Sequence, residues 1–316
     1  MPIANRSAAA ALGAVAALVL GALAWGVLVE RNRFTVRRET LPVLEPGAAP
    51  LTVLHLADLH LAPWQHRKQQ WVRSLADLNP DVVVNTGDNL GHGDALEALE
   101  YALEPLRGIP GVFVHGSNDY FGPEPKNPFA YLLKPSGHSE RAATLNTAAL
   151  ESFFEDDLGW HSLNNRAAAL LINRTRVEFF GVNDAHRGWD RLEALPGAIE
   201  AMHENSEDGE ETLAVGVTHA PYRRVLDSFV THGAEVIFAG HTHGGQVRIP
   251  GLPALVTNCD IPNAQASGLS VWEHAQRGAF LNVSAGIGTS IYAPVRFACP
   301  PEAVLVTLTS GDFSYS

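Results

Sequence analysis

Residues 240–246 read Gly240-His241-Thr-His243-Gly-Gly-Gln246 and directly follow an apolar segment that is expected to form a strand over 235–239. The same succession, an apolar strand and then a polar cluster, recurs four more times along the chain. The other clusters are Asp58-Leu-His60, Gly87-Asp88-Asn89, Gly116-Ser-Asn118-Asp119 and His219-Ala-Pro221. In open α/β sheets, ligands bind just beyond the carboxyl ends of strands. We therefore expect the five clusters to form a single site at one edge of a sheet.

The segments between these clusters alternate between strand-like and helix-like patterns. Short apolar or β-branched runs predict strands, and apolar residues at helical spacing predict helices between them. Strands are expected over 51–57, 82–84, 111–114, 168–172, 177–182, 213–218, 235–239, 280–283 and 303–308, and helices over 71–78, 94–106, 189–203 and 222–230. Residues 121–138 and 250–270 lack a periodic pattern and are expected to be surface loops. The pattern predicts an α/β domain.

Composition limits the class of protein and of partner. The chain has 316 residues, 46% of them hydrophobic and 18% charged, which is typical of a globular protein. Its formal net charge of −12 argues against a nucleic-acid partner, because basic patches supply most of that affinity. Two cysteines, Cys259 and Cys299, are too few for a disulfide scaffold or a Cys-rich zinc module, and we expect two free thiols.

The first fifty residues differ from the rest. Residues 8–29 carry no charged side chain and are long enough to cross a bilayer, while arginines follow them at positions 31, 33, 37 and 38. Because positive residues gather on the cytoplasmic side of a span, we expect a single-pass anchor in the cell membrane with the following domain in the cytoplasm. The alternatives are an anchor facing outward and a cleaved signal peptide. The expected organisation is an anchor over 1–30, a basic juxtamembrane segment and linker over 31–50, and one catalytic domain over 51–316.

The residue types in the clusters favour metal binding. Asp58 and His60, like His241 and His243, lie two residues apart, which on an extended chain places both side chains on one face. Imidazole and carboxylate groups bind first-row metals such as Mn, Fe or Zn. Any one of these pairs is a weak signal, since most His-x-His pairs are not metal sites, but five clusters after five strands form a specific pattern.

In this order the clusters resemble the motifs of the calcineurin-like metallophosphoesterases, and the resemblance covers residues 51–308. The tail, with Gly286-Ile-Gly-Thr-Ser290 and Pro294-Val-Arg-Phe297, is similar to the membrane-anchored bacterial branch of that family. The resemblance implies a two-sheet β-sandwich flanked by helices, here preceded by one transmembrane helix. It also implies two divalent metal ions at the strand ends.

Carried over by motif, the resemblance assigns roles to seven residues. Asp58, His60 and His243 would hold the first metal. His219, His241 and Asn118 would hold the second. Asp88 would bridge the two ions. Asp88, Asn118 and His219 would also act in catalysis.

One motif departs from the family pattern. The family usually has Gly-Asn-His-Asp, with the asparagine as ligand and the histidine as leaving-group acid, where this chain has Gly116-Ser117-Asn118-Asp119. An ungapped alignment puts Ser117 in the ligand position, but an amide oxygen is the better ligand, so we expect Asn118 to serve. Without the acid, pyrophosphates and other activated esters are favoured over alkyl phosphomonoesters. His92 or His115 are alternative acids.

These observations predict a membrane-anchored two-metal phosphoesterase that cleaves a phosphodiester or a pyrophosphate. The anchor favours a lipid-linked or membrane-proximal substrate, and nothing in the sequence indicates an oligomeric state. The rivals are a degenerate, non-catalytic metal-binding membrane module and a metal-dependent hydrolase of C–N or C–O bonds. Outside the clusters, His55 is expected to be a packed core histidine, and Arg296 to contact a substrate phosphate or form a surface salt bridge.

Overall fold

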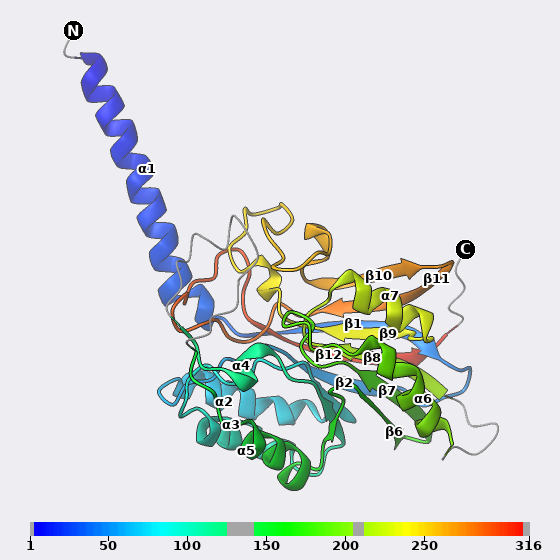
Figure 1. The fold of residues 1–316 in the computed structure, drawn as a ribbon. Coiled ribbons are helices and arrows are strands. Elements are labelled where there is room, and N and C mark those ends of the chain that lie inside the picture. The colour runs from blue at the N-terminus through cyan, green and yellow to red at the C-terminus, as the bar shows by residue number, and fades with distance from the viewer. Residues whose placement is uncertain (1–2, 125–141, 205–211, 312–316) are drawn as a thin grey trace.

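Two stacked β-sheets with helices on both outer faces form the domain (Figure 1). The computed structural model describes residues 3–124, 142–204 and 212–311. Within these ranges each sheet has six strands. The predicted fold class is confirmed.

The first sheet contains both terminal strands of the domain. β2, β3, β4 and β5 are parallel, β12 runs antiparallel to β2, and β1 pairs in parallel with β12. The bounds in sheet order are β1 (Thr35–Leu44), β12 (Glu302–Ser310), β2 (Leu51–Leu56), β3 (Val82–Asn85), β4 (Gly111–Phe113) and β5 (His161–Ser162).

The second sheet has a parallel centre and antiparallel edges. β11, β9, β8 and β7 are parallel, while β10 and β6 close the two sides. The bounds in sheet order are β10 (Gly268–His274), β11 (Arg277–Val283), β9 (Val236–Ala239), β8 (Thr212–Thr218), β7 (Thr175–Gly181) and β6 (Arg166–Ile172). Valines and phenylalanines from the inner faces of both sheets form the central core layer.

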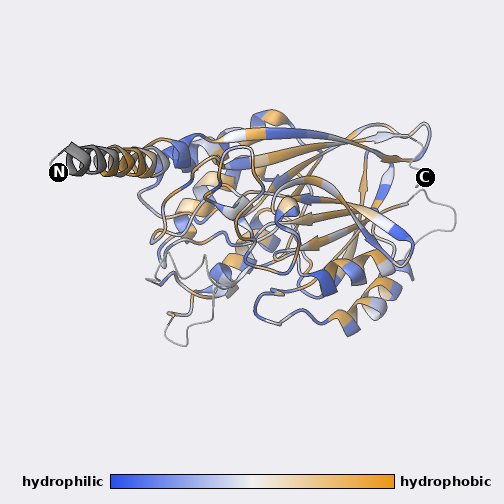
Figure 2. Cartoon of the chain, turned by 90° about the horizontal axis from the view of Figure 1, so that it is seen from above, coloured by the Kyte–Doolittle hydropathy of each residue, from blue (hydrophilic) through white to orange (hydrophobic). Residues whose placement is uncertain are grey.

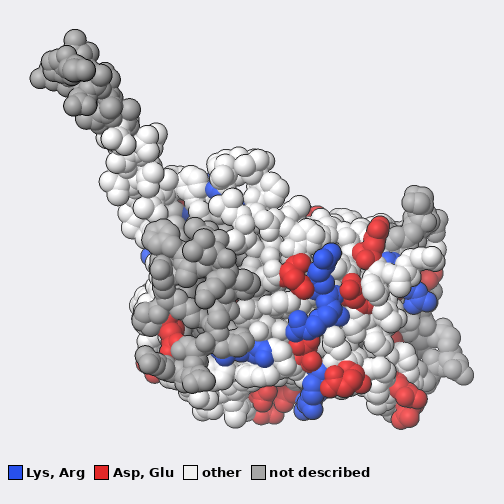
Figure 3. All heavy atoms as spheres, turned by 45° about the horizontal axis from the view of Figure 1, so that its top comes forward, with Lys and Arg blue, Asp and Glu red and all other residues white. Residues whose placement is uncertain are grey.

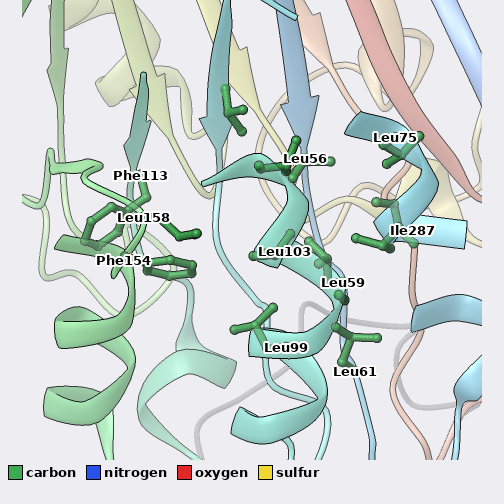
Figure 4. Close-up of a cluster of buried hydrophobic side chains, with 14 of the residues drawn as sticks. Leu56, Leu59, Leu61, Leu75, Leu99, Leu103, Phe113, Phe154, Leu158 and Ile287 are labelled. Atoms are coloured by element: carbon green, nitrogen blue, oxygen red, sulfur yellow. The ribbon is translucent and has the colours of Figure 1, made fainter. Parts of the chain in front are cut away.

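Helices cover the outer faces with two further apolar layers. On one face, leucines and aromatic rings of α2, α3, α5 and their neighbouring loops pack against the first sheet (Figure 4). On the other face, α6 and α7 cover the second sheet. The α-helices are α2 (His66–Ser74), α3 (Leu96–Leu103), α4 (Ser117–Tyr120), α5 (Thr147–Ser152), α6 (Leu195–His203) and α7 (Arg223–Thr231). Short turns are η1 (Glu30–Asn32), η2 (Leu75–Leu78), η3 (Glu104–Leu106), η5 (Phe153–Asp157), η6 (Leu192–Ala194), η7 (His243–Gly245) and η8 (Asn263–Gln265).

The segment 31–50, expected to be a basic juxtamembrane stretch and linker, contains a strand. Residues 39–44 belong to β1, which pairs with β12 along its whole length. Pro42 and the charges of this segment hid the strand, but an edge strand tolerates both, because its outer side makes no ladder hydrogen bonds. The predicted loop over 250–270 holds as far as β10, whereas most of the loop predicted over 121–138 lies outside the described residues.

The N-terminal helix α1 (Ile3–Leu28) projects from the domain (Figure 1). The stretch Leu12–Asn32 is long and apolar enough to cross a membrane, and 6% of its most apolar window is buried against the protein. Figure 2 shows the described part of the helix in hydrophobic colours, with hydrophilic residues where it meets the domain. A membrane span remains a candidate on these criteria.

Candidate metal centre

The five polar clusters meet at one edge of the stacked sheets. They follow β2, β3 and β4 in the first sheet and β8 and β9 in the second. All five strands are parallel to a neighbour within their sheet, so their carboxyl ends lie on the same side. All seven residues predicted for the site are buried or half-buried there, as expected for one shared cluster rather than separate surface turns.

The ligand candidates come together through left-handed backbone rather than an extended chain. The φ angles are +50° at Asp58, +40° at His60, +56° at Asp88, +67° at His241 and +49° at His243. The argument that an extended chain aligns the residues of each pair was therefore wrong in its geometry. Non-glycine residues adopt this region at a cost of about 1–2 kcal/mol each, and such strain concentrates at functional sites.

A first group of donor atoms joins Asp58, His60 and His243. Their donor atoms lie within 4.8 Å of one another. The Nε2 atoms of the two histidines are 3.2 Å apart, and Nε2 of His243 lies 3.6 Å from Oδ1 of Asp58. These distances leave the three donors facing a common point, as a cation site requires.

A second group is built on Asp88 and shares Asp58 with the first. Asp58, Asp88 and His219 have donor atoms within 4.8 Å of one another. Oδ2 of Asp88 lies 3.6 Å from Nε2 of His219 and 3.5 Å from Nε2 of His60. Nδ1 of His241 lies 3.2 Å from Nε2 of His219. The carboxylate of Asp88 thus lies close to one histidine of each group, and Asp58 belongs to both.

Backbone carbonyls on the far side of two histidines aim the other ring nitrogen into the centre. Nδ1 of His219 donates to the carbonyl of Thr86 at 2.8 Å, and Nδ1 of His243 donates to that of Gly288 at 3.2 Å. Both Nδ1 atoms are thereby directed outward, and the two Nε2 atoms point into the centre. Carbonyl partners of this kind fix the tautomer of metal-binding histidines. Lone pairs that face each other across about 3 Å are repulsive unless a cation or proton lies between them.

Asp119 holds the loop that carries Asp88. Its Oδ2 accepts from the amides of Asp88 and Gly116, and its Oδ1 accepts from the amide of Asn89. Gly116 must be glycine, because a Cβ there would collide with Oδ1 of Asp88 and the ring of His219. The loop after β3 and the loop after β4 are thus in direct contact at the centre. The side chain of one bonds the backbone of the other.

Asn118 lies on Asp88. Its backbone amide donates to Oδ1 at 2.8 Å, and its side-chain amide donates to Oδ2 at 2.7 Å. Ser117, the residue before it, begins α4 and is half-buried. Asn118 therefore contacts both oxygens of the Asp88 carboxylate.

The electrostatics of the centre suit a cation. Burial lowers the pKa of His60 to about 4 and holds the pKa values of His241 and His243 well below the usual value, so these rings are neutral donors at neutral pH. Burial opposes protonation of His219, but Asp88, Asp58 and Asp184 together raise its pKa to about 9. Burial raises the pKa of Asp58 to about 7. Several buried carboxylates around one point favour positive charge there, so the donor set fits divalent ions.

A sixth cluster, missed in the sequence, follows β7. It reads Asn183-Asp184-Ala-His186 and obeys the same rule as the other five, an apolar strand followed by polar residues. The ring of His186 packs 4.6 Å from that of His241 and its Nδ1 lies 2.9 Å from the hydroxyl of Tyr222. Asp184 is fully buried, and its Oδ2 has no hydrogen-bond partner among the described residues.

The structure also tests the predictions made for two residues outside the clusters, His55 and Arg296. His55 is fully buried between Thr86 and Asn282, which confirms the core prediction. Both predictions for Arg296 are wrong. It is fully buried, and it donates to the carbonyls of Ala285, Gly286, Gly288 and Cys299, so it braces the loop behind Asp58.

His115 and His92, the two alternative candidates for the leaving-group acid, lie in different surroundings. His115 is fully buried between Asp119 and Glu151, so its ring is enclosed by protein. His92 is partly exposed and packs edge-on against Trp64. Cys259 and Cys299 are free thiols, as expected.

Residues 51–245, the part of the chain that contains all seven residues predicted for the site, match the family model described as calcineurin-like phosphoesterase. The chain belongs to the calcineurin-like phosphoesterase family. Members of this metallophosphoesterase family are metal-dependent phosphoester hydrolases that typically bind two divalent ions, and the two donor groups described above are the candidate ligands here.

Two relatives from Bacillus subtilis (strain 168) match nearly the whole chain. The uncharacterized protein YpbG is 26% identical over 286 residues, which cover 88% of each chain. The uncharacterized metallophosphoesterase YkuE is 19% identical over 291 residues, which cover 90% of this chain and 87% of that one. Among solved structures, TT1561 of Thermus thermophilus has a TM-score of 0.39 at 12% identity, covering 76% of this chain and 91% of that chain.

Proposed function

We propose that this chain is a membrane-anchored two-metal phosphoesterase that hydrolyses a phosphodiester or pyrophosphate bond. The observation that carries the proposal is the convergence of two donor groups, which share Asp58, at the ends of four strands, β2, β3, β8 and β9. Divalent ions in such a pair activate a water for in-line attack at phosphorus and stabilise the phosphoryl oxygens. The alternative, a non-catalytic metal-binding module, shares the ligands but not the hydrolysis.

Each ligand has a proposed place. Asp58, His60 and His243 hold the first ion. His219, His241 and Asn118 hold the second. Asp88 would be the ligand common to both ions, because its Oδ2 lies 3.5 Å from Nε2 of His60 and 3.6 Å from Nε2 of His219.

We assign the ligand role in the departing motif to Asn118 rather than to Ser117. Asn118 already contacts the proposed bridging carboxylate through both its backbone and its side chain. An amide oxygen is also a better ligand than a neutral hydroxyl. Position 118 then binds the metal ion, and the chain has no histidine at that position to protonate a leaving group. The substrates that suit this site have good leaving groups, such as the phosphate of an anhydride or an acidic alcohol.

The proposed anchor is α1, with the domain on the cytoplasmic side. Its apolar surface is exposed, and arginines rather than acidic residues dominate the segment that follows it. An enzyme held at a membrane meets lipid-linked phosphate esters at high local concentration, so this substrate class is the one we propose.

The test uses the full-length protein in nanodiscs. Metal content is measured by elemental analysis before and after chelation, and hydrolysis is followed with an aryl phosphodiester and with a lipid pyrophosphate. We expect two ions per chain, and activity that is lost with the ions and restored by Mn²⁺, Fe²⁺ or Zn²⁺.

Each result has a separate meaning. Two ions without hydrolysis of any ester would favour the non-catalytic module. No bound ion at any concentration would overturn the metal centre itself. Hydrolysis of the aryl ester but not of the lipid pyrophosphate would leave the phosphoesterase standing and reject the lipid-linked substrate class.

A further inference from the structure

The base of α1 is fastened to the domain rather than joined by a flexible linker. Arg296 donates its backbone amide to the carbonyl of Gly26, and Glu30 accepts from the indole of Trp25 and from the amide of Cys299. A Cβ at Gly26 would lie 2.7 Å from the carbonyl oxygen of Arg296. The helix therefore leaves the domain in a fixed direction. The same face of the domain always lies on the side from which α1 projects.

An apolar loop lies on that face. Residues 249–255 read Ile-Pro-Gly-Leu-Pro-Ala-Leu and contain no charged side chain. Ile249 is 50% exposed, Leu252 54% and Leu255 45%, while Ala254 is buried against Gly245 and fixes the loop from beneath. Three large apolar side chains exposed within seven residues are unusual for a surface that contacts only water.

Backbone hydrogen bonds connect this loop to the base of α1. The amide of Arg248 donates to the carbonyl of Phe297, whose own amide donates to the carbonyl of Gln246. The neighbouring Arg296 is the residue bonded to Gly26. One short segment, 295–297, thus contacts both the helix and the root of the loop. Figure 1 shows the loop (gold) on the side of the domain from which α1 rises.

The surface around this place is poor in charge. In Figure 3, where the top of the molecule comes forward, the visible described surface near the base of α1 shows a few basic and hardly any acidic side chains, and most charged side chains gather farther from the helix. The exposed ring of Tyr292 belongs to the segment 290–293, whose Ala293 carbonyl accepts from the side chain of Gln246. Two prolines in the loop lack an amide hydrogen, which reduces the number of donors that must leave water.

We propose that Ile249, Leu252, Leu255 and Tyr292 form a surface that inserts into the interface of a lipid bilayer. This inference rests on α1 as a membrane anchor and not on the catalytic activity. A fixed helix brings the same face to the membrane in every molecule, and an apolar loop with an aromatic residue beside it is the composition that the bilayer interface accepts. The loop begins shortly after η7, which carries His243, so its insertion places the metal centre close to the headgroups.

The test places a tryptophan on the surface of the full-length chain. Leu252→Trp and, as the matched control, Leu171→Trp are reconstituted in phosphatidylcholine nanodiscs with plain or brominated acyl chains. Leu171 is 71% exposed on β6, which Figure 1 shows at the far end of the domain from α1. The emission added by each new tryptophan is obtained by subtracting the wild type.

We expect the emission added at position 252 to shift to shorter wavelength and to lose most of its intensity with brominated lipid, and the emission added at 171 to stay unchanged. Tyr292→Trp is a second probe and should behave like Leu252→Trp. Equal, negligible quenching at 252, 292 and 171 would overturn the proposal. Resistance of the wild type to alkaline extraction from vesicles tests the anchor separately, and neither readout depends on hydrolysis.

Discussion

At the scale of single residues, hydrogen bonds to neighbouring groups orient several of the proposed ligands without any metal. His219 and His243 are oriented by the carbonyls of Thr86 and Gly288, and Asp88 sits on a loop that Asp119 ties to Gly116. A preorganised set of donors loses less entropy when it closes around an ion, because the side chains are already ordered. The position of the proposed metal centre is therefore set by backbone contacts.

The two histidines of the His241-x-His243 pair should serve different ions. His243 faces Asp58 and His60, whereas His241 faces His219. We predict that His241→Ala and His243→Ala each lose at least about 10²-fold in activity, since even outer-shell changes at metal sites cost about 10–100-fold. Anomalous-scattering maps should show a different ion depleted in each variant. Both ions at full occupancy in either variant would contradict this division of ligands.

The absence of a histidine at position 118 predicts a steep dependence on the leaving group. General-acid help contributes about 10²–10⁴-fold, so its lack should slow basic leaving groups most. The measurement is kcat/KM for phosphodiesters of graded leaving-group pKa, in the wild type and in His92→Ala and His115→Ala. A flat dependence in the wild type that becomes steep in either variant would identify that histidine as the acid and reject our assignment.

At the scale of elements, the segment 284–300 acts as the back wall of the centre. Arg296 reaches three carbonyls of the 285–288 loop, and the amides of Ile287 and Gly288 donate to the carbonyls of Ala57 and Asp58. The guanidinium thus replaces water as the donor for a loop that is shut off from solvent. The turn that carries Asp58 depends on this brace.

Removal of that brace should cost both stability and metal. In Arg296→Met several buried carbonyls lose their donor, at about 1–3 kcal/mol for each group left unsatisfied. We predict a fall of about 3 kcal/mol or more in the free energy of unfolding, with weaker binding of the ion at Asp58. Thermal unfolding and metal titration measure both, with the exposed Arg277→Met as control. A variant as stable as this control would show that the brace is dispensable.

The sequence predicted the elements that carry the site better than those at the margins. Strands with buried β-branched runs, such as β3 and β9, were recognisable because both their faces are covered. β1 was missed, since many of its residues face solvent and its partner β12 is distant in the sequence. The polar cluster at Asp184 followed the general rule but lacked a familiar motif, and the burial of Arg296 could not be inferred without the loop around it.

At the scale of the whole molecule, the helix α1 and the domain form one continuous unit. α1 is followed by η1 and then by β1, and the side chain of Glu30 bonds the helix base to the 295–299 segment. The convergence of the five clusters at one sheet edge was predictable from the motifs, whereas the left-handed backbone of the residues in them was not. Which face of the domain lies on the side of α1 could be known only from the folded structure, because segments distant in the sequence form it.

The proposed cytoplasmic orientation of the domain is open to a direct test. Arg31 and Arg33 follow the apolar helix, and positive residues stay on the cytoplasmic side. We predict that a reporter active only in the cytoplasm, fused after residue 316, is active, and that one active only outside is silent. The reverse pattern would place the domain outside, and activity of both in separate pools would indicate mixed topology.

The most direct test of the proposed two-metal centre is to compare the wild type with Asp88→Asn for metal stoichiometry and hydrolysis of an aryl phosphodiester. A bridging carboxylate neutralises both ions, and an amide of the same size cannot, so the account predicts two ions per chain in the wild type and fewer in the variant. It also predicts a loss of activity of at least about 10²-fold. The exposed Asp77→Asn should match the wild type in both measurements. Unchanged stoichiometry and full activity in Asp88→Asn would contradict the central claim.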